Sequence, residues 1–335
     1  MKITQVHNTL QEQRALLTSP QIYIYPVKSL RGISLPTANL CAQGLGYDRR
    51  YILLKIHPNG KYTSMFIGLQ PEMALFHCKL STPDTFTVEY HTPSPPVALP
   101  TASQQTILEM PLEPDATKLQ KISIALHTAP DYPAYRMPDH INTWFSECFG
   151  YECIMAYLGD SLGVRMGDER EKAWMPKIKS ILPKQVDQVS FSDGAALLVA
   201  SESSMEDLHP RLPDGEKAVL EKFRPNIVVE GEGKPWDEDY WAELTLPRIG
   251  GKVVLTSNCA RCTSINVDLE KGRMGEGESG KLLKKLMKDR RIDPGKRWEP
   301  IFGRYGFPTK GGEIRVGDEI LLSKRNAEHT VFSEC

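Results

Sequence analysis

Trp241-Ala242-Glu243-Leu244-Thr245-Leu246, Gly250-Gly251 and Val253-Val254-Leu255 are the stretch that decides the fold, because together they predict a β-hairpin. The two glycines supply the tight turn between two strand-forming runs. The hairpin delivers the chain to Ser257-Asn258-Cys259-Ala260-Arg261-Cys262-Thr263. Short strands of this kind recur, and helical patterns are few. The chain is therefore predicted to be α+β and mainly β, with strands closed into barrels rather than a doubly wound sheet.

Further strand-forming runs lie on both sides of this hairpin. They are rich in β-branched and aromatic residues or alternate in polarity, and they cover residues 21–27, 50–56, 86–90, 121–125, 226–230 and 313–322. With 335 residues, the chain is long enough for two domains. We predict a flexible N-terminus at residues 1–20, a β-barrel-like domain at 21–160, a second barrel domain at 161–325 and a tail at 326–335. The charged segment 166–179 is predicted to connect the two halves.

One helix is clearly marked, from Asp139 to Cys148. Ile141, Trp144, Phe145 and Cys148 recur at the spacing of one helical face, which predicts that they are buried. Asp139 is predicted to cap the first turn, and the following Gly150 to provide a left-handed exit.

Composition excludes several classes of protein. The formal net charge is -1, so no overall field favours nucleic acid or an anionic membrane. The seven cysteines are odd in number and scattered, unlike the disulfide framework of a secreted domain. The polar first 20 residues lack the apolar core of a signal peptide, and no run of about 18 apolar residues predicts a transmembrane helix. We expect a cytoplasmic protein in a reducing compartment, without nucleic-acid partners.

Cys259-Ala260-Arg261-Cys262 is the main candidate for chemistry. Thiolates bind soft metals and are stabilised by nearby cations such as Arg261. A structural zinc site would need four ligands, and no second cysteine pair or suitable histidine pair is present. A thioredoxin-like dithiol would begin a helix, whereas residues 264–268 look extended. Two small residues at a strand end, or a redox dithiol, remain alternatives. The pattern favours one thiolate that serves a cofactor bringing its own remaining ligands.

The glycine-rich segment Gly275-Glu276-Gly277-Glu278-Ser279-Gly280-Lys281 resembles a phosphate-binding loop only superficially. That loop requires Ser or Thr after the lysine, and Leu282 stands there instead. The two glutamates would repel phosphate, and no apolar strand precedes the glycines. A flexible surface loop is predicted, and nucleotide binding is rejected.

Three short basic elements add donors for an anion. Phe223-Arg224-Pro225-Asn226 places a guanidinium and an amide just before a strand, and forked donors of this kind suit anions and heterocycles. Lys28-Ser29 and Asp48-Arg49 likewise put a cation next to a second polar group at strand ends. Each element alone is typical of a solvated surface pair. Their combination with the cysteine pair predicts a binding site.

Taken in order, these motifs resemble the MOSC-domain family, and within it the two-domain branch of the mitochondrial amidoxime-reducing component. The resemblance covers about residues 21 to 322. The segments that carry it are Tyr25-Pro26-Val27-Lys28-Ser29, Gly44-Leu45-Gly46-Tyr47-Asp48-Arg49, Phe191-Ser192-Asp193, Phe223-Arg224-Pro225-Asn226-Ile227-Val228, Cys259-Ala260-Arg261-Cys262 and Ile314-Arg315-Val316-Gly317-Asp318.

The resemblance implies an N-terminal MOSC-type β-barrel domain packed on a C-terminal MOSC β-barrel with a few short helices. It also implies a molybdenum cofactor (Mo-molybdopterin), with Cys262 as the protein ligand of molybdenum and Arg261 beside the metal as a catalytic residue. Cys259 would be a neighbour with a lining or redox role. The residues implied to bind the cofactor are Lys28, Ser29, Arg49, Asp193, Arg224, Asn226, Cys259 and Arg261.

The activity implied by the family is reduction of N-hydroxylated compounds of the amidoxime or N-hydroxylamine type, with electrons from cytochrome b5 and its reductase. One alternative is a carrier of molybdenum cofactor or persulfide sulfur, related to the C-terminal part of molybdenum-cofactor sulfurases. Another is a metal-free interaction module. Two departures stand out: no targeting segment or anchor is recognisable, which leaves mitochondrial association open, and Gly194-Ala195-Ala196 lacks hydroxyl donors.

Overall fold

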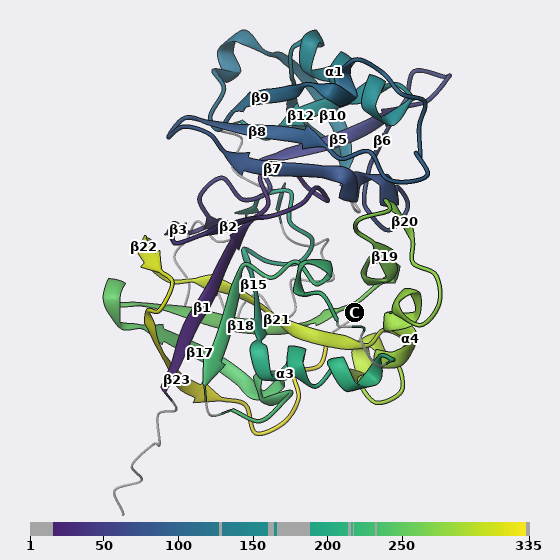
Figure 1. Cartoon of the computed structure of the whole chain (residues 1–335). Coiled ribbons are helices and arrows are strands. Elements are labelled where there is room, and N and C mark those ends of the chain that lie inside the picture. The colour runs from purple at the N-terminus through teal and green to yellow at the C-terminus, as the bar shows by residue number, and fades with distance from the viewer. Residues whose placement is uncertain are drawn as a thin grey trace, which may run out of the picture.

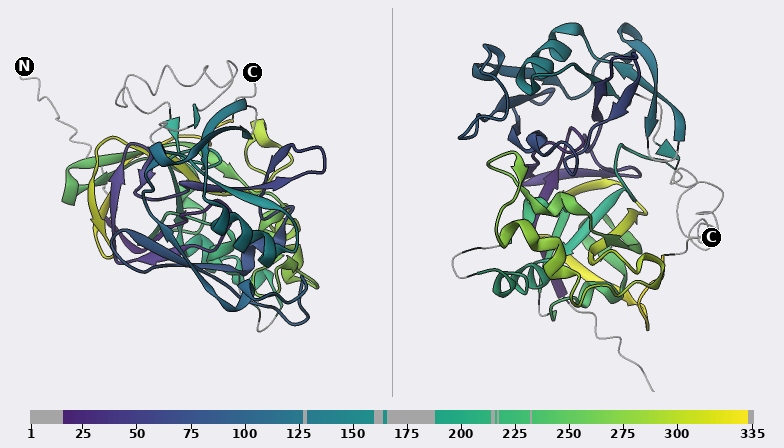
Figure 2. Two further views of the ribbon diagram at one scale, coloured as in Figure 1. Left: turned by 90° about the horizontal axis from the view of Figure 1, so that it is seen from above. Right: turned by 90° about the vertical axis from the view of Figure 1, so that its right-hand side faces the viewer.

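The computed structural model describes residues 16–126, 129–159, 164–165, 188–213, 216, 218–231 and 233–332. Two β-rich parts are stacked on each other, one built mainly from β5 to β12 with α1 and the other from a large sheet with α3 and α4 (Figure 1). A view from the side shows the same two parts (Figure 2). The predicted mainly-β fold with few helices is therefore confirmed.

The larger sheet closes into a barrel. Within the described residues, seven strands follow one another in the order β16-β15-β21-β18-β17-β23-β1, and β1 also pairs with β16, which closes the ring. β2 extends the sheet beyond β1. The predicted hairpin is present as β17 and β18, with Leu246 opposite Gly251. The strands are β1 (Leu16–Ile24), β2 (Ile33–Leu35), β15 (Leu197–Ser201), β16 (Ile227–Gly231), β17 (Trp241–Leu246), β18 (Gly251–Ala260), β21 (Ile301–Pro308) and β23 (Glu319–Arg325).

β1 differs from the sequence-based expectation in its partners. Residues 16–20 were assigned to a flexible N-terminus and residues 21–27 to the first domain, yet all of β1 lies in the C-terminal barrel. Leu17, Ile22 and Ile24 are buried, and the strand pairs with both β16 and β23. Alternation within a strand reveals which side chains are buried, but not which distant strand supplies the hydrogen bonds.

The N-terminal part contains two antiparallel sheets and the main helix. A five-stranded sheet has the order β10-β11-β12-β5-β6, and β7, β8 and β9 form the second sheet. α1 (Asp139–Phe149) buries the predicted stripe, and Gly150 has a φ of 77° at its end. The predicted cap is wrong: Asp139 is itself the first helical residue and pairs with Arg136 at 2.6 Å. The strands are β5 (Tyr51–Ile56), β6 (Tyr62–Ser64), β7 (Phe76–Leu80), β8 (Thr85–Tyr90), β9 (Ile107–Pro111), β10 (Gln120–Leu126), β11 (Ala129–Arg136) and β12 (Cys153–Tyr157).

Smaller elements complete the described residues. They are β3 (Thr37–Cys41), β4 (Gly44–Leu45), β13 (Val164–Arg165), β14 (Gln188–Val189), β19 (Val267–Asp268), β20 (Arg273–Met274), β22 (Gly312–Arg315), α3 (Glu202–Glu206) and α4 (Leu282–Leu286). The predicted connection at residues 166–179, the first 15 residues and the last three residues of the predicted tail lie outside the described residues.

Gly44 packs closely against the backbone of Ala196. Its φ is +115°, and a Cβ atom there would lie 2.2 Å from the carbonyl oxygen of Ala196. We expect Gly44→Ala to lower the free energy of unfolding by about 2–4 kcal/mol, because both the strained backbone and the overlap act against it. Gly60→Ala is the control, since Gly60 has a φ of +74° but nothing within 4 Å of its Cβ position. Urea unfolding measures both variants, and equal losses would contradict the role of the close contact.

Candidate functional site

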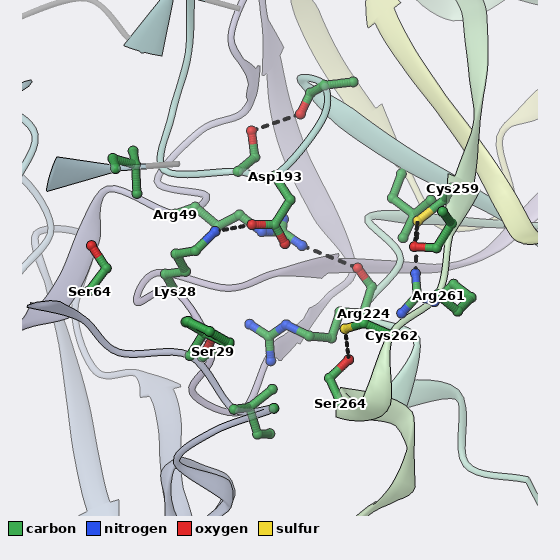
Figure 3. A pocket seen from close by; sticks show the side chains of 18 of the residues that line it. Lys28, Ser29, Arg49, Ser64, Asp193, Arg224, Cys259, Arg261, Cys262 and Ser264 are labelled. Atoms are coloured by element: carbon green, nitrogen blue, oxygen red, sulfur yellow. Dashed lines mark hydrogen bonds and ion pairs between the residues drawn. The ribbon is translucent and has the colours of Figure 1, made fainter. Parts of the chain in front are cut away.

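A cavity of about 520 Å³ lies where the two parts meet, within the size range of about 300–1,000 Å³ that is usual for small-molecule and cofactor sites. Its lining includes β6 and β10 of the N-terminal part and the end of β18 in the barrel. The cavity brings together every residue that the sequence assigned to the site: Lys28, Ser29, Arg49, Asp193, Arg224, Asn226, Cys259, Arg261 and Cys262. All of them except Asn226 are labelled in Figure 3.

The two cysteines of the motif occupy different environments. Cys259 lies within β18 and is buried, whereas Cys262 follows the strand and is exposed. The Arg261 guanidinium donates a hydrogen bond from Nη1 to Cys259 Sγ at 2.9 Å, while Cys262 Sγ donates to Ser264 Oγ at 3.2 Å. In the part of the chain that the structure describes, no group of three or more His, Cys, Asp or Glu side chains could hold a metal ion. Cys262 therefore offers one accessible sulfur rather than part of a protein-only metal cage.

The sulfur of Cys259 acts to raise the pKa values of both Arg261 and Tyr305. Burial lowers the pKa of Arg261, but Cys259, Tyr305 and Cys262 together outweigh this effect, and the pKa is raised above its ordinary value. Burial and Cys259 raise the pKa of Tyr305 well above its ordinary value, so the phenol stays protonated. Both side chains line the cavity. Arg261 thus contacts Cys259 directly, and the sequence could not show which of the two sulfurs it would contact.

Two guanidinium groups share one aromatic ring beneath the cavity. The Cζ atoms of Arg224 and Arg49 lie 4.2 Å and 4.7 Å from the ring centroid of Tyr25. Burial, followed by the nearby charge of Arg49, lowers the pKa of Arg224 to about 10. Arg224 Nη2 is buried and has no hydrogen-bond partner within the described residues. Since a buried charged donor left unpaired is costly, this nitrogen indicates that an acceptor from a ligand completes the site.

Backbone strain concentrates at the same place. Among the described residues other than glycine, five have a positive φ, and three of them line the cavity: Ser29 at 71°, Arg49 at 51° and Arg224 at 57°. Such conformations cost energy and persist where the surrounding structure enforces them, which is common at ligand-binding sites. The strain places the three side chains on one side of the cavity at the expense of local stability.

Lys28 and Asp193 come from distant segments and meet in the cavity. Lys28 Nζ forms an ion pair with Asp193 and donates to the carbonyl oxygen of Phe191 at 2.9 Å. The Asp193 side chain is 65% exposed, whereas that of Lys28 is 8% exposed. The segment at residues 191–193 therefore contributes to the cavity through Asp193 and a backbone carbonyl, although the following Gly194-Ala195-Ala196 has no hydroxyl group.

Comparison with known proteins identifies the family of this chain. The model of the MOSC N-terminal beta barrel domain matches residues 17–152, and the model of the MOSC domain matches residues 186–321. The chain belongs to the MOSC-domain family. Mitochondrial amidoxime-reducing component 1 of Mus musculus is 28% identical over 314 residues, which are 91% of this chain and 82% of that protein. The Homo sapiens protein of the same name is also 28% identical, over 91% of this chain and 82% of its own length.

A second group of relatives of this MOSC protein consists of longer proteins. Molybdenum cofactor sulfurase of Solanum lycopersicum is 29% identical over 324 residues, which are 92% of this chain but 36% of the sulfurase. Our chain therefore resembles about a third of that enzyme. Among the described residues, no helix has the length and apolar composition needed to cross a bilayer.

In this MOSC protein, sequence reasoning missed the wall that the N-terminal part contributes. Tyr62, Ser64 and Phe66 line the cavity from β6 and the turn after it, and Leu126 lines it from the end of β10. No motif marks them, because their place follows from how the two parts pack. Sequence reasoning also missed Tyr305 on β21, which lines the cavity. It directly follows Arg304, a residue with no exposed surface.

The glycine-rich segment 275–281 lies outside the lining of the cavity. Glu278 forms ion pairs with Lys281 at 2.9 Å and Lys285 at 2.7 Å, and these hydrogen bonds lower the pKa of its carboxyl group to about 2. Both lysines are thereby engaged with a carboxylate rather than oriented towards a phosphate.

Proposed function

We propose that this protein binds the molybdenum cofactor in the cavity and reduces N-hydroxylated compounds of the amidoxime type. The observation that carries the proposal is the pairing of one accessible thiol, on Cys262, with a buried and unpartnered guanidinium nitrogen, on Arg224, in the same cavity. The similarity to amidoxime-reducing components over 91% of the chain supports the choice of this activity.

The residues present fit the parts of such a cofactor. Phosphate and pterin groups are bound by Lys, Arg, Ser and Asn donors, which Lys28, Ser29, Arg224 and Asn226 provide. The metal of such a cofactor would take two sulfur ligands from the pterin and one from the protein, and Cys262, an exposed thiol in the cavity lining, would supply the latter. We infer that these groups hold and orient the cofactor.

When bound, the cofactor supplies two-electron redox chemistry at molybdenum. In the proposed reaction an amidoxime takes up two electrons and two protons, its N–O bond breaks, and the oxygen leaves as water while the amidine remains. We propose cytochrome b5 and its reductase as the electron source. The protein's own task is to place the substrate next to Cys262 and to limit the access of water.

Arg224→Lys tests the cofactor site. A lysine has no planar fork and cannot reproduce both the bond from Arg224 Nη1 to the carbonyl oxygen of Leu30 at 2.6 Å and the free Nη2 donor. We expect the molybdenum content of the purified variant to fall about tenfold, which corresponds to one lost charge-assisted hydrogen bond. Arg31→Lys is the control, because Arg31 pairs with Glu270 and does not belong to the lining. Elemental analysis gives the result, and equal molybdenum in the two variants would count against the assignment.

A carrier of molybdenum cofactor or sulfur is the second candidate, favoured by the similarity to a molybdenum cofactor sulfurase over 92% of the chain. Benzamidoxime and a reconstituted cytochrome b5 chain separate the two functions. Reduction to benzamidine supports the reductase, whereas bound molybdenum without reduction supports the carrier. A protein free of molybdenum after expression in a cofactor-producing host would indicate a metal-free interaction module.

A further inference from the structure

We propose that β6 and Phe66 form the binding wall for the organic part of the substrate, and that the Phe66 ring selects neutral compounds with an aromatic group. This inference rests on the proposed function, because it names the substrate class of the same cavity. Its evidence is the charge of the two walls, the nearness of Phe66 to the segment after Cys262 and the hydrogen bonds of the turn that carries Phe66.

The two walls of the cavity differ in charge. Lys28, Arg224, Arg261 and both thiols lie on β18 or in segments that follow β1 and β18 or precede β16. Arg49 comes just before β5, but its guanidinium donates to Asn226 and Arg224 and so belongs to the same wall. The wall from β6, the turn after it and β10 has no charged side chain among its described lining residues, which are Tyr62, Thr63, Ser64, Phe66, Ile67, Gly68, Ala125 and Leu126. Ser64 and Cys262 lie at opposite sides of the cavity (Figure 3). A charged substrate would find no partner on this wall, so the wall favours a neutral one.

Phe66 lies near the segment that follows Cys262. A Cβ atom on Gly68 would be 3.8 Å from Phe66 Cδ2, 3.5 Å from Thr263 Oγ1 and 3.7 Å from the backbone nitrogen of Ser264. Ser264 Oγ in turn accepts the hydrogen bond from Cys262 at 3.2 Å. The ring and the segment after the thiol therefore flank the same point, and a flat group stacked on Phe66 would bring its attached N–O group close to Cys262.

The turn that carries Phe66 is held rigidly. The carbonyl oxygen of Phe66 accepts hydrogen bonds from the backbone nitrogens of Leu69 and Gln70, both at 2.9 Å. Gln70 Oε1 accepts a hydrogen bond from the Phe66 backbone nitrogen at 3.1 Å. The neighbouring Met65 is fully buried, yet the large ring of Phe66 remains 43% exposed. An aromatic ring fixed in an open position beside a cavity is suited to stacking with a flat ligand.

The test compares Phe66→Ala with Leu69→Ala. Leu69 belongs to the same turn and is 67% exposed, but it is not part of the cavity lining. With the molybdenum-loaded enzyme, we expect Phe66→Ala to raise the KM for benzamidoxime about tenfold, the effect of losing one good apolar contact. Neither kcat nor molybdenum content should change. The KM for acetamidoxime, which has no ring, should change less than about twofold, and Leu69→Ala should resemble the wild type for both substrates.

A binding measurement separates this inference from the proposed function. Isothermal titration of benzamidoxime into the three loaded proteins reports Kd without turnover. If the wild type reduces neither compound, but Phe66→Ala alone weakens benzamidoxime binding about tenfold, the reductase function is wrong and the binding wall stands. No binding by the wild type, equal affinity of wild type and Phe66→Ala, or an equal loss in Leu69→Ala would overturn the inference.

Discussion

Replacement of Cys262 by serine is expected to abolish benzamidoxime reduction, by at least about a thousandfold, which equals about 4 kcal/mol of activation free energy. The variant should also lose most of its molybdenum. Cys262 is the exposed thiol of the motif, and it lies in the same cavity as the unpaired Arg224 donor. A serine hydroxyl is a hard oxygen group that stays protonated at neutral pH, and it cannot replace a soft thiolate ligand. Turnover of benzamidoxime and elemental analysis of the same sample measure both losses.

Cys259→Ser is expected to be milder. Cys259 is buried, and its sulfur accepts a hydrogen bond from Arg261, a role that a hydroxyl oxygen also performs. Cys41→Ser serves as the control for thiol loss in general, because Cys41 is partly exposed and is not among the lining residues. If Cys262→Ser were as active as the wild type, or if Cys259→Ser lost more molybdenum, the assignment of the metal ligand would be wrong.

Arg304→Met is expected to cause the largest loss of stability, about 3–5 kcal/mol, because it removes the charge at the centre of a buried polar network. Arg304 has no exposed surface, and its Nη1 donates to Asn258 Oδ1 at 2.5 Å. Burial lowers the pKa of Arg304 to about 10, and the nearby carboxylates Asp239 and Asp293 act against this effect. Methionine has a similar volume but can neither donate a hydrogen bond to Asn258 nor balance the charge of the two carboxylates. Since Asn258 directly precedes Cys259, we also expect the cavity lining at Cys259 to become less ordered.

Arg325→Met is the matched control for that prediction. Arg325 forms two hydrogen bonds with Asp237, at 2.7 Å and 2.6 Å, and its side chain is 47% exposed. Loss of an exposed ion pair is expected to cost about 0–1 kcal/mol. The midpoints and slopes of urea unfolding compare the two variants. A loss for Arg304→Met no greater than that for Arg325→Met would show that the buried network adds little stability.

The local patterns of the sequence predicted the main helix, several strands and the residue types that gather at the cavity. The Gly250-Gly251 turn predicts the β17–β18 hairpin, and the spacing of Ile141, Trp144, Phe145 and Cys148 predicts α1. Both follow from interactions between residues close in the chain. The cap at Asp139 was wrong, because Asp139 forms an ion pair with Arg136 instead. The residue types at the cavity were readable because thiols and cations are chemically distinctive, although their roles stay predictions.

By itself, the sequence determined the β17–β18 hairpin, several further strands, the place of the main helix and which thiol and cationic side chains the chain offers. Only the tertiary structure decided that β1 closes the C-terminal barrel, that Cys262 is exposed while Cys259 is buried, and that Phe66 faces the cavity. The physical reason is separation along the chain. Periodicity and turn chemistry act over a few residues, whereas strand partners, burial and cavity walls depend on the packing of segments far apart in the chain, as in the pairing of Leu16 with Leu321.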